Sequence, residues 1–308
     1  MLSFTPYDLT AVAITAPYFA VKEDRLCDWT AAGCYLWSSS YTYAYTIVAD
    51  CLIMQLTLSF GQLYSYPMGQ GDTEAALAAL EQHCREVGQP LRFASLSPEL
   101  TDRLSRRYGE ATRVKPLTGY SDYLYRYEDL STFAGRRYSG QRNHINQFIK
   151  KHPAWQYLPL TAEQIPSVLA FADEYIRLKQ SRGEMAESEL EDMNGVRGVL
   201  AAWTHLPVQG GVITVDDTVV GFAVGEQVGD TLYVHIEKAD IRYAGVYQLL
   251  VREFAAHSAA EGLRYINRED DAGDPGLRQS KLAYRPCAMA EKFSITIERN
   301  KPHEKHTS

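Results

Sequence analysis

The segment from Thr231 to Gly262 constrains the fold most, because a strand, a glycine turn and an amphipathic helix follow one another there. The alternation in the strand predicts an apolar face of Leu232, Val234 and Ile236 and a polar face of Tyr233, His235 and Glu237. The turn is Arg242-Tyr243-Ala244-Gly245, and apolar residues then recur at helical spacing. Such an order can aim backbone amides and the positive end of a helix at a phosphate or pyrophosphate.

The bulk composition is that of an ordinary globular protein with room for two domains. The chain has 308 residues, 45% of them apolar, and a formal net charge of −7. This charge disfavours a broad grip on nucleic acid, so we expect no DNA partner, while a local basic patch stays open. No apolar run reaches the ~20 residues that span a bilayer, and no signal sequence is evident at the N-terminus, so we expect a cytoplasmic protein without a membrane span.

The order of expected elements predicts two similar α/β units in tandem, with mixed parallel and antiparallel pairing in their sheets. We expect an N-terminal unit over residues 1–130, a connecting helix over 131–152 and a C-terminal unit over 153–308. The stretch from Leu130 to Ala162 has no acidic residue, which makes the connecting helix basic. The first unit is interpreted as a degenerate copy that shapes the cleft.

Two stretches carry a resemblance to a known family. They are Gly140-Gln-Arg-Asn-His-Ile-Asn-Gln-Phe148 in the connector and Tyr265-Ile-Asn-Arg-Glu-Asp-Asp271, which continues through Arg278 and Lys281 to Tyr284-Arg-Pro286. Together with the element order over most of residues 130–297, they resemble soluble relatives of the C-terminal domain of phosphatidylglycerol lysyltransferase, a family with a tandem GNAT fold. The resemblance implies two GNAT-like acyltransferase units joined by a basic helix.

The resemblance also implies an activity, the transfer of an activated acyl or aminoacyl group to an amine or hydroxyl of a small-molecule or peptide acceptor. The donor would be acyl-CoA or aminoacyl-tRNA, acting as a co-substrate rather than as a tightly bound cofactor. A strand splayed from its neighbour at Glu237 would favour a thioester, and a basic rim from Arg136 to Lys151 would favour tRNA. The alternative is a noncatalytic module that keeps the fold and binds an amino-acid-like or nucleotide ligand.

Three residues are candidates for catalysis. Acyl transfer to an amine needs a base, and Glu237 or His235 on the predicted polar face can supply it. The alternative for both is a strand face covered by the neighbouring unit or by water. The resemblance adds Tyr284 as an acid that protonates the leaving group, against a packing role in a chain with 21 tyrosines.

The donor-binding candidates are Arg242, Tyr243, Ala244 and Gly245 in the turn, with Arg278 and Lys281 on a later helix. The resemblance compares the turn with the GNAT Q/R-x-x-G-x-G/A loop, from which Tyr247 departs at the last position. A surface arginine with an ordinary turn glycine, and a helix with ordinary surface charges, are the alternatives.

The substrate-binding candidates are Arg142, Asn267, Glu269, Asp270 and Asp271. Clustered carboxylates can hold a substrate ammonium, or they can form a solvated acidic turn. Arg142 lies in line with an apolar stripe, so it either pairs with an acid across the domain interface or lines the acceptor cleft. No His or Cys accompanies the acids at ligand spacing, and the five cysteines include no C-x-x-C pair, so we predict no metal and no disulfide framework.

Overall fold

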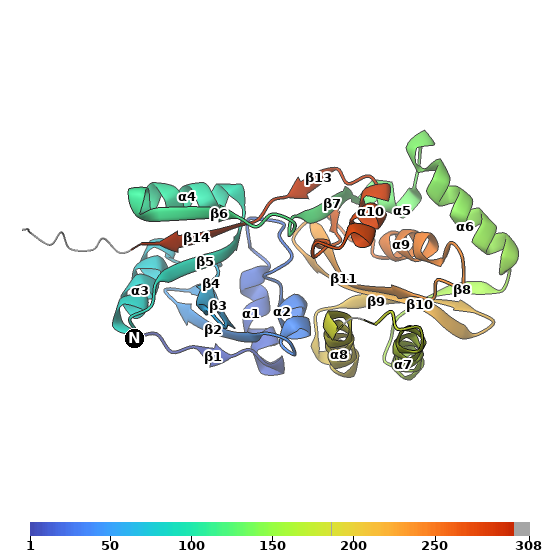
Figure 1. The fold of residues 1–308 in the computed structure, drawn as a ribbon, viewed down its shortest axis with the longest axis horizontal. Helices are drawn as coiled ribbons and strands as arrows, with labels where there is room; N and C mark the ends of the chain where they lie inside the picture. The colour runs from blue at the N-terminus through green and yellow to red at the C-terminus, as the bar shows by residue number, and fades with distance from the viewer. Residues whose placement is uncertain (186, 299–308) are drawn as a thin grey trace, which may run out of the picture.

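The computed structural model describes residues 1–185 and 187–298 and contains two seven-stranded mixed sheets, side by side along the long axis (Figure 1). The first sheet has the order β1-β2-β3-β4-β5-β14-β6: Thr5–Pro6, Thr42–Val48, Cys51–Leu58, Gly61–Tyr64, Leu91–Leu96, Phe293–Ile297 and Thr112–Pro116. The second has the order β13-β7-β12-β11-β10-β9-β8: Ala288–Ala290, Asp122–Arg126, Tyr265–Asn267, Thr231–Ala239, Thr218–Val228, Gln209–Val215 and Trp155–Pro159. The mixed α/β class and the two tandem units are confirmed.

The two sheets exchange strands. Strand β7, from the first half of the chain, pairs with β12 and β13 in the second sheet. Strand β14, near the C-terminus, lies between β5 and β6 in the first sheet. The proposed boundary at residue 130 stays a prediction, but the chain crosses between the sheets twice, once before β7 and once before β14.

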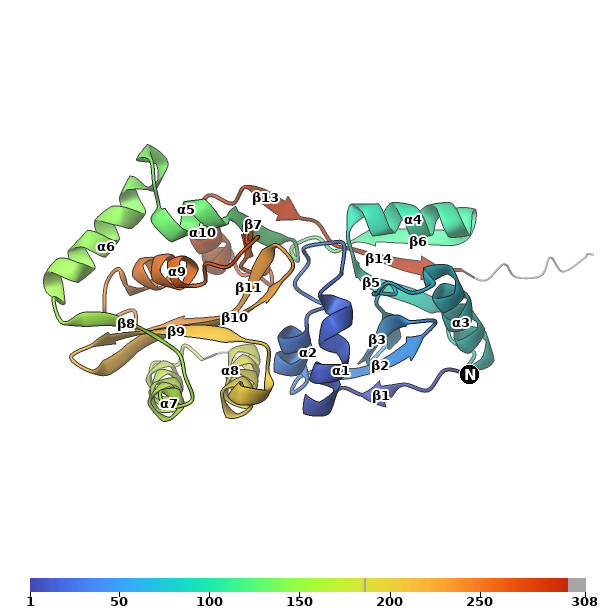
Figure 2. The ribbon, with the colours of Figure 1, turned by 180° about the vertical axis from the view of Figure 1, so that it is seen from behind.

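The helices cover the sheets from both faces. The first unit has α1 (Leu9–Phe19), α2 (Ala31–Trp37), α3 (Thr73–Glu86) and α4 (Pro98–Tyr108). The second has α5 (Tyr127–Thr132), α6 (Ser139–Lys151), α7 (Ile165–Ser181), α8 (Glu187–Ala201), α9 (Val246–His257) and α10 (Pro275–Ala283). Figures 1 and 2 show α7 and α8 on one face of the second sheet and α5, α6, α9 and α10 on the other. Among the described residues, no helix is both long and apolar enough to cross a bilayer.

Helix α6, expected to join the two units, instead packs on α9 within the second unit. The units are connected by the crossing strands and by a shared core, in which residues of α1 and α2 lie in one apolar cluster with residues of α8 and β10. Gly195 of α8 shows how close this contact is, since a Cβ there would lie 2.5 Å from the carbonyl oxygen of Leu36 in α2. The sheets therefore share one interior rather than meeting through a solvated surface.

A β-bulge in β11 changes which side chains share a face of that strand, compared with the simple alternation predicted from the sequence. Val234 pairs with Gly225 and Ile236 with Val224, which leaves His235 as the extra residue. Ile236 therefore packs in the core beneath α7 and α8, whereas Leu232 and Val234 pack toward α9. The prediction that His235 and Glu237 share a face is wrong, because Glu237 lines a small cavity together with Leu232 and Val234.

Candidate functional site

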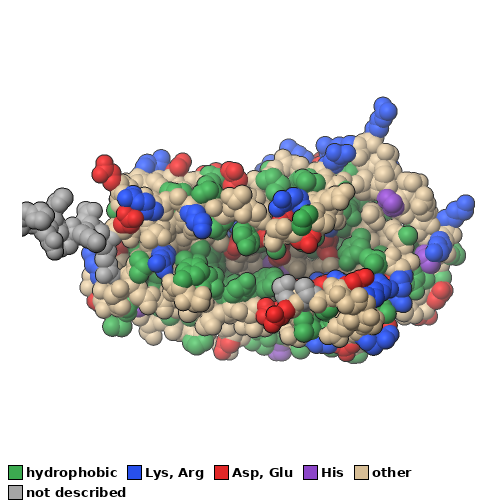
Figure 3. All heavy atoms as spheres, in the orientation of Figure 1, with side chains coloured by type: hydrophobic (Ala, Val, Ile, Leu, Met, Phe, Trp, Pro, Cys, Tyr) green, Lys and Arg blue, Asp and Glu red, His purple; other side chains and the backbone are tan. Residues whose placement is uncertain are grey.

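A cavity of about 750 Å³ lies beside the turn from β11 to α9. Its walls come from α7, from β10 and the preceding turn, and from the segment Ala239–Tyr243. Basic and acidic side chains are intermingled over α7 on the surface around it (Figure 3). The structure thus places an open, ligand-sized space next to the predicted donor-binding turn.

The donor-binding turn is internally bonded. The backbone amide of Arg242 donates to Asp240 Oδ1 at 2.9 Å, and its guanidinium pairs with the same carboxylate at 2.6 Å. The amide of Tyr243 donates to the carbonyl of Asp240 at 3.0 Å, and that of Val246 donates to the carbonyl of Tyr243 at 3.0 Å. An anion at this turn would have to compete with Asp240 for Arg242.

Gly245 has a packing reason for being glycine. Its φ is +92°, and a Cβ would lie 2.5 Å from the carbonyl oxygen of His144 in α6. The ring of His152, which follows α6, also lies 5.1 Å from that of Tyr243. The turn is therefore held between α6 on one side and the cavity on the other, with Ala244 exposed.

Glu237 and Tyr284 meet through a residue that sequence reasoning did not single out, Arg268. Its guanidinium donates to Glu237 Oε2 from Nη2 at 2.5 Å and from Nε at 3.0 Å. The same group lies 4.5 Å from the ring of Tyr284 and 5.7 Å from that of Tyr125. Burial raises the pKa of Tyr284, and Arg268 Nη1 is buried with no hydrogen-bond partner. Arg268 lies within Tyr265–Asp271, one of the stretches that resemble the family, and that position could have marked it as a site residue.

His235 belongs to a different, buried group at the junction of the two units. Its Nδ1 lies 2.8 Å from Glu269 Oε1, and its Nε2 lies 3.1 Å from Glu226 Oε1. Burial by itself would lower the pKa of His235, but the hydrogen bonds to the two carboxylates raise it to about 9. The raised pKa favours the imidazolium form, in which both ring nitrogens donate and neither has the lone pair that a base needs.

Glu226 connects this histidine to the first unit. Its Oε1 also accepts from the backbone amides of Ala32 and Gly33, at 3.0 and 3.3 Å. Although burial opposes ionisation, the contact with His235 lowers the pKa of Glu226. For Glu269 the burial effect is stronger and its pKa is raised.

A second buried cation, Lys292, lies close to the same junction. Its Nζ lies 2.6 Å from Asp122 Oδ1, 2.7 Å from Asp28 Oδ2 and 3.4 Å from Cys27 Sγ. Cys27, Asp28 and Asp122 offer ligand atoms within 4.8 Å of one another, but the Lys292 ammonium already contacts all three. Sequence reasoning missed this group because its members lie far apart along the chain.

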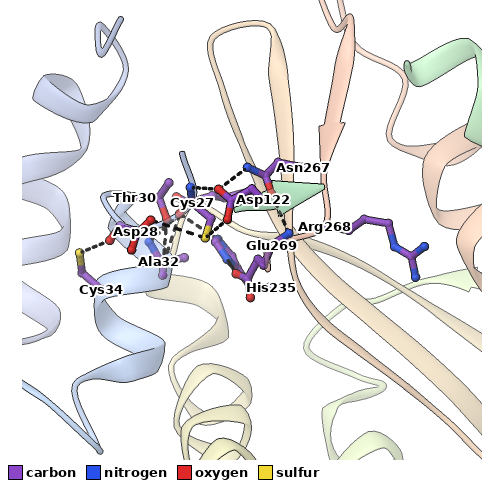
Figure 4. Close-up of polar contacts among 12 residues, drawn as sticks. Cys27, Asp28, Thr30, Ala32, Cys34, Asp122, His235, Asn267, Arg268 and Glu269 are labelled. Atoms are coloured by element: carbon purple, nitrogen blue, oxygen red, sulfur yellow. Dashed lines mark hydrogen bonds and ion pairs between the residues drawn. The ribbon is translucent and has the colours of Figure 1, made fainter. Parts of the chain in front are cut away.

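The predicted substrate-binding residues Asn267, Asp270 and Asp271 form hydrogen bonds or ion pairs with other side chains of the protein. The side-chain amide of Asn267 donates to Asp122 Oδ2 at 2.9 Å, and Asp270 lies 3.4 Å from Lys292. Asp271 accepts from Tyr123 Oη at 2.5 Å and from Arg278 Nε at 2.8 Å. Figure 4 shows Asn267 and Glu269 turned toward residues 27–34 of the first unit, while Arg268 points away from them.

Lys281 and Arg142 bind main-chain carbonyl groups. Lys281 Nζ donates to the carbonyl oxygen of Arg268 at 2.5 Å and also to that of Asp270, and burial lowers its pKa. Arg142 Nη1 donates to the carbonyl oxygen of Gly135 at 2.6 Å and also to that of Phe133. Within residues 1–185 and 187–298, Arg142 has no acidic partner, so the expected pairing with an acid across the interface is wrong.

Comparison with known proteins gives the family. The model for phosphatidylglycerol lysyltransferase, C-terminal, matches residues 19–296. The chain belongs to this family. An uncharacterised protein of Mycoplasmoides gallisepticum is 24% identical over 186 residues, which are 58% of this chain and 56% of that relative, so the chain matches about half the length of the relative.

Solved structures extend the likeness over nearly the whole chain. A conserved protein of unknown function from Bacteroides thetaiotaomicron is 26% identical, with a TM-score of 0.89 over 97% of this chain and 100% of that one. The C-terminal DUF2156 domain of a putative lysylphosphatidylglycerol synthetase from Agrobacterium fabrum is 12% identical, with a TM-score of 0.64 over 95% and 93%. L-PGS from Bacillus licheniformis is 13% identical, with a TM-score of 0.64 over 97% and 94%. The last two establish a shared fold.

Proposed function

We propose that this chain is an aminoacyltransferase that moves an aminoacyl group from aminoacyl-tRNA to an amine or hydroxyl of a small-molecule or peptide acceptor. The family supports group transfer, since its model is named for a lysyltransferase and one similar fold is that of a putative lysylphosphatidylglycerol synthetase. The observation that carries the proposal is the cavity of about 750 Å³ at the β11–α9 turn, a turn that the basic helix α6 contacts from its other side.

The gap between β11 and β12 argues against a thioester donor. The parallel ladder ends where Tyr233 pairs with Asn267, and β11 continues beyond it to Ala239. The ion pair of Arg268 with Glu237 lies in the space that follows, where the remaining cavity measures about 10 Å³. A space of that size holds about one water molecule. A pantetheine arm does not fit there in this conformation.

The surface of α6 supports a tRNA donor. Lys150 and Lys151 at the end of α6 and Arg136 just before its start are exposed, and no acid pairs with them among the residues the structure describes. Helix α6 contacts the turn through His144 and Gly245, on the side of the turn away from the cavity. Phosphates of a tRNA acceptor arm would bind along α6 while the esterified end enters the cavity.

The chemistry proposed is direct transfer. The acceptor nitrogen or oxygen attacks the ester carbonyl and loses its proton to a base, the bond from the carbonyl carbon to the ribose oxygen breaks, and the base returns the proton to that oxygen. Of the two candidate bases, Glu237 keeps Oε1 outside its two bonds to Arg268. It lines the small cavity rather than the large one, so its use as the base requires the ion pair with Arg268 to open toward the bound ester. His235, whose two ring nitrogens contact Glu269 and Glu226, would instead help to hold the two units together.

The test compares donors and charges. The double variant Lys150→Glu/Lys151→Glu should weaken binding of aminoacyl-tRNA at least roughly tenfold at low salt, since two phosphate contacts are lost. Lys115→Glu, an exposed lysine on β6 of the other sheet, is the matched control and should bind normally. Equal binding by all three proteins, or protection by acyl-CoA alone in a thermal-shift assay, would refute the tRNA donor.

One observation favours a second function, a noncatalytic ligand-binding module. Glu237, His235 and Asp271 all have charged partners inside the protein, as in a site that has become structural. Single-turnover assays with charged tRNA and a mixed amine acceptor pool distinguish the two. Saturable binding without loss of the aminoacyl ester would establish the binding module.

A further inference from the structure

The floor of the cavity beside the β11–α9 turn is apolar. Phe171 and Leu178 of α7, Val219 of β10 and Ala239 supply apolar side chains to its lining. Ile241 also lines the cavity, and 68% of its surface is exposed. Any group that fills the cavity would bury this apolar surface.

Most charges around the cavity are paired within the protein, although Arg182 and Glu184 lie 3.9 Å apart and Asp217 has no ion pair among the described residues. Lys179 binds Glu189 at 2.5 Å, and Arg242 binds Asp240 at 2.6 Å. Glu174 binds Arg177 at 2.6 Å, while Asp217 lies in the exposed turn before β10. Among the lining residues that the structure describes, no buried carboxylate is left to receive a cationic side chain.

These two facts bear on which aminoacyl group the cavity accepts. An ammonium buried without a carboxylate loses its hydration, whereas an aliphatic or aromatic side chain gains by leaving water. We propose that the cavity receives the apolar side chain of the transferred aminoacyl group and discriminates against a lysyl side chain. This inference rests on the proposed function, because it takes the cavity to be the donor site.

The size of the cavity fits this assignment. A space of about 750 Å³ falls in the range of 300–1,000 Å³ that is typical of small-ligand sites. It can hold a leucyl or phenylalanyl group together with part of the terminal adenosine. The paired charges at the rim would then face the ribose and the α-amino group rather than the side chain.

Calorimetric titration of the full chain with non-hydrolysable 3′-aminoacylamide analogues of adenosine tests the proposal. The leucyl and phenylalanyl analogues should bind at least roughly tenfold more tightly than the lysyl analogue. Equal binding, or tighter binding of the lysyl analogue, overturns the inference and leaves the proposed function standing. If none of the analogues binds, the donor site itself is wrong and both fall.

Substitutions in the cavity test whether its lining residues determine the preference for apolar over lysyl analogues. Val219→Asp places a carboxylate on the floor and should shift preference toward the lysyl analogue roughly tenfold, whereas Val219→Asn, of the same size, should not. Ile241→Asp at the exposed edge is a second test that does not disturb packing. Ile47→Asp, on the first sheet, is the control and should keep the original preference. Unchanged preference in both aspartate variants at the cavity overturns the inference.

Discussion

Replacing Lys292 by methionine tests whether the junction between the two units depends on one buried cation. The Lys292 side chain is 1% exposed and Asp122 is 0% exposed, and their ion pair measures 2.6 Å. Removing one partner of a buried pair leaves an uncompensated charge and typically costs about 3–5 kcal/mol. Asp28, with 29% of its side chain exposed, can turn to water and adds little to that cost. We therefore expect Lys292→Met to lower the free energy of unfolding by about 3–5 kcal/mol.

Urea unfolding followed by tryptophan fluorescence measures this change. Lys115→Met, which removes an exposed lysine from the first sheet, should change stability by less than about 0.5 kcal/mol. Adding Asp122→Asn to Lys292→Met should restore part of the loss, because the stranded charge is then gone.

The deficit should also depend on pH. Burial already raises the pKa of Asp122, and without Lys292 it would rise further. A raised folded-state pKa means that the folded variant takes up a proton as the pH falls, so its deficit should be smaller near pH 5 than near pH 8. A loss below about 1 kcal/mol, or a deficit that does not change with pH, would contradict the assignment of Lys292 as the compensating cation.

Three further predictions concern single residues of the site. Gly245→Ala should destabilise by about 1–3 kcal/mol more than Gly183→Ala, because both glycines have positive φ but only Gly245 faces a backbone atom within 4 Å, and equal thermal shifts would contradict this. The folded-state pKa of His235, about 9, lies above its unfolded value, so the stability that protonated His235 contributes is complete below about pH 6.5 and is lost as pH rises through 9. His235→Gln should therefore reduce the change in the free energy of unfolding between about pH 6 and 10. Glu237→Gln should lower kcat by about 100-fold or more with little change in KM, and full turnover would exclude Glu237 as the base.

Local patterns in the sequence predict the elements of the second unit but not their relations in space. The alternation from Thr231 to Ala239 and the helical spacing after Gly245 produce β11 and α9, because each depends on neighbours a few residues away. The bulge at His235 depends instead on how β11 pairs with β10, and the sequence of one strand does not contain that register. Every side chain beyond the bulge was therefore assigned to the opposite face.

The candidate site divides in the same way. The motif residues Asn267, Glu269 and Asp271 were found, yet their partners Asp122, His235 and Tyr123 come from strands at other positions in the chain. Lys292 follows no pattern of its own, and only the fold brings it to Asp28 and Asp122. Arg242 and Gly245 were recognised as a turn, but the cavity beside them exists because α7 stands opposite.

The place of β14 between β5 and β6 sets an order of events during synthesis. Strands β5 and β6 end at Leu96 and Pro116, whereas β14 begins only at Phe293. Strands β5 and β6 do not pair with each other, because β14 lies between them. While the ribosome is still making the second half, the inner edges of both strands are therefore open to incorrect pairing or to a chaperone. The first sheet of this protein is completed only after β14 has emerged.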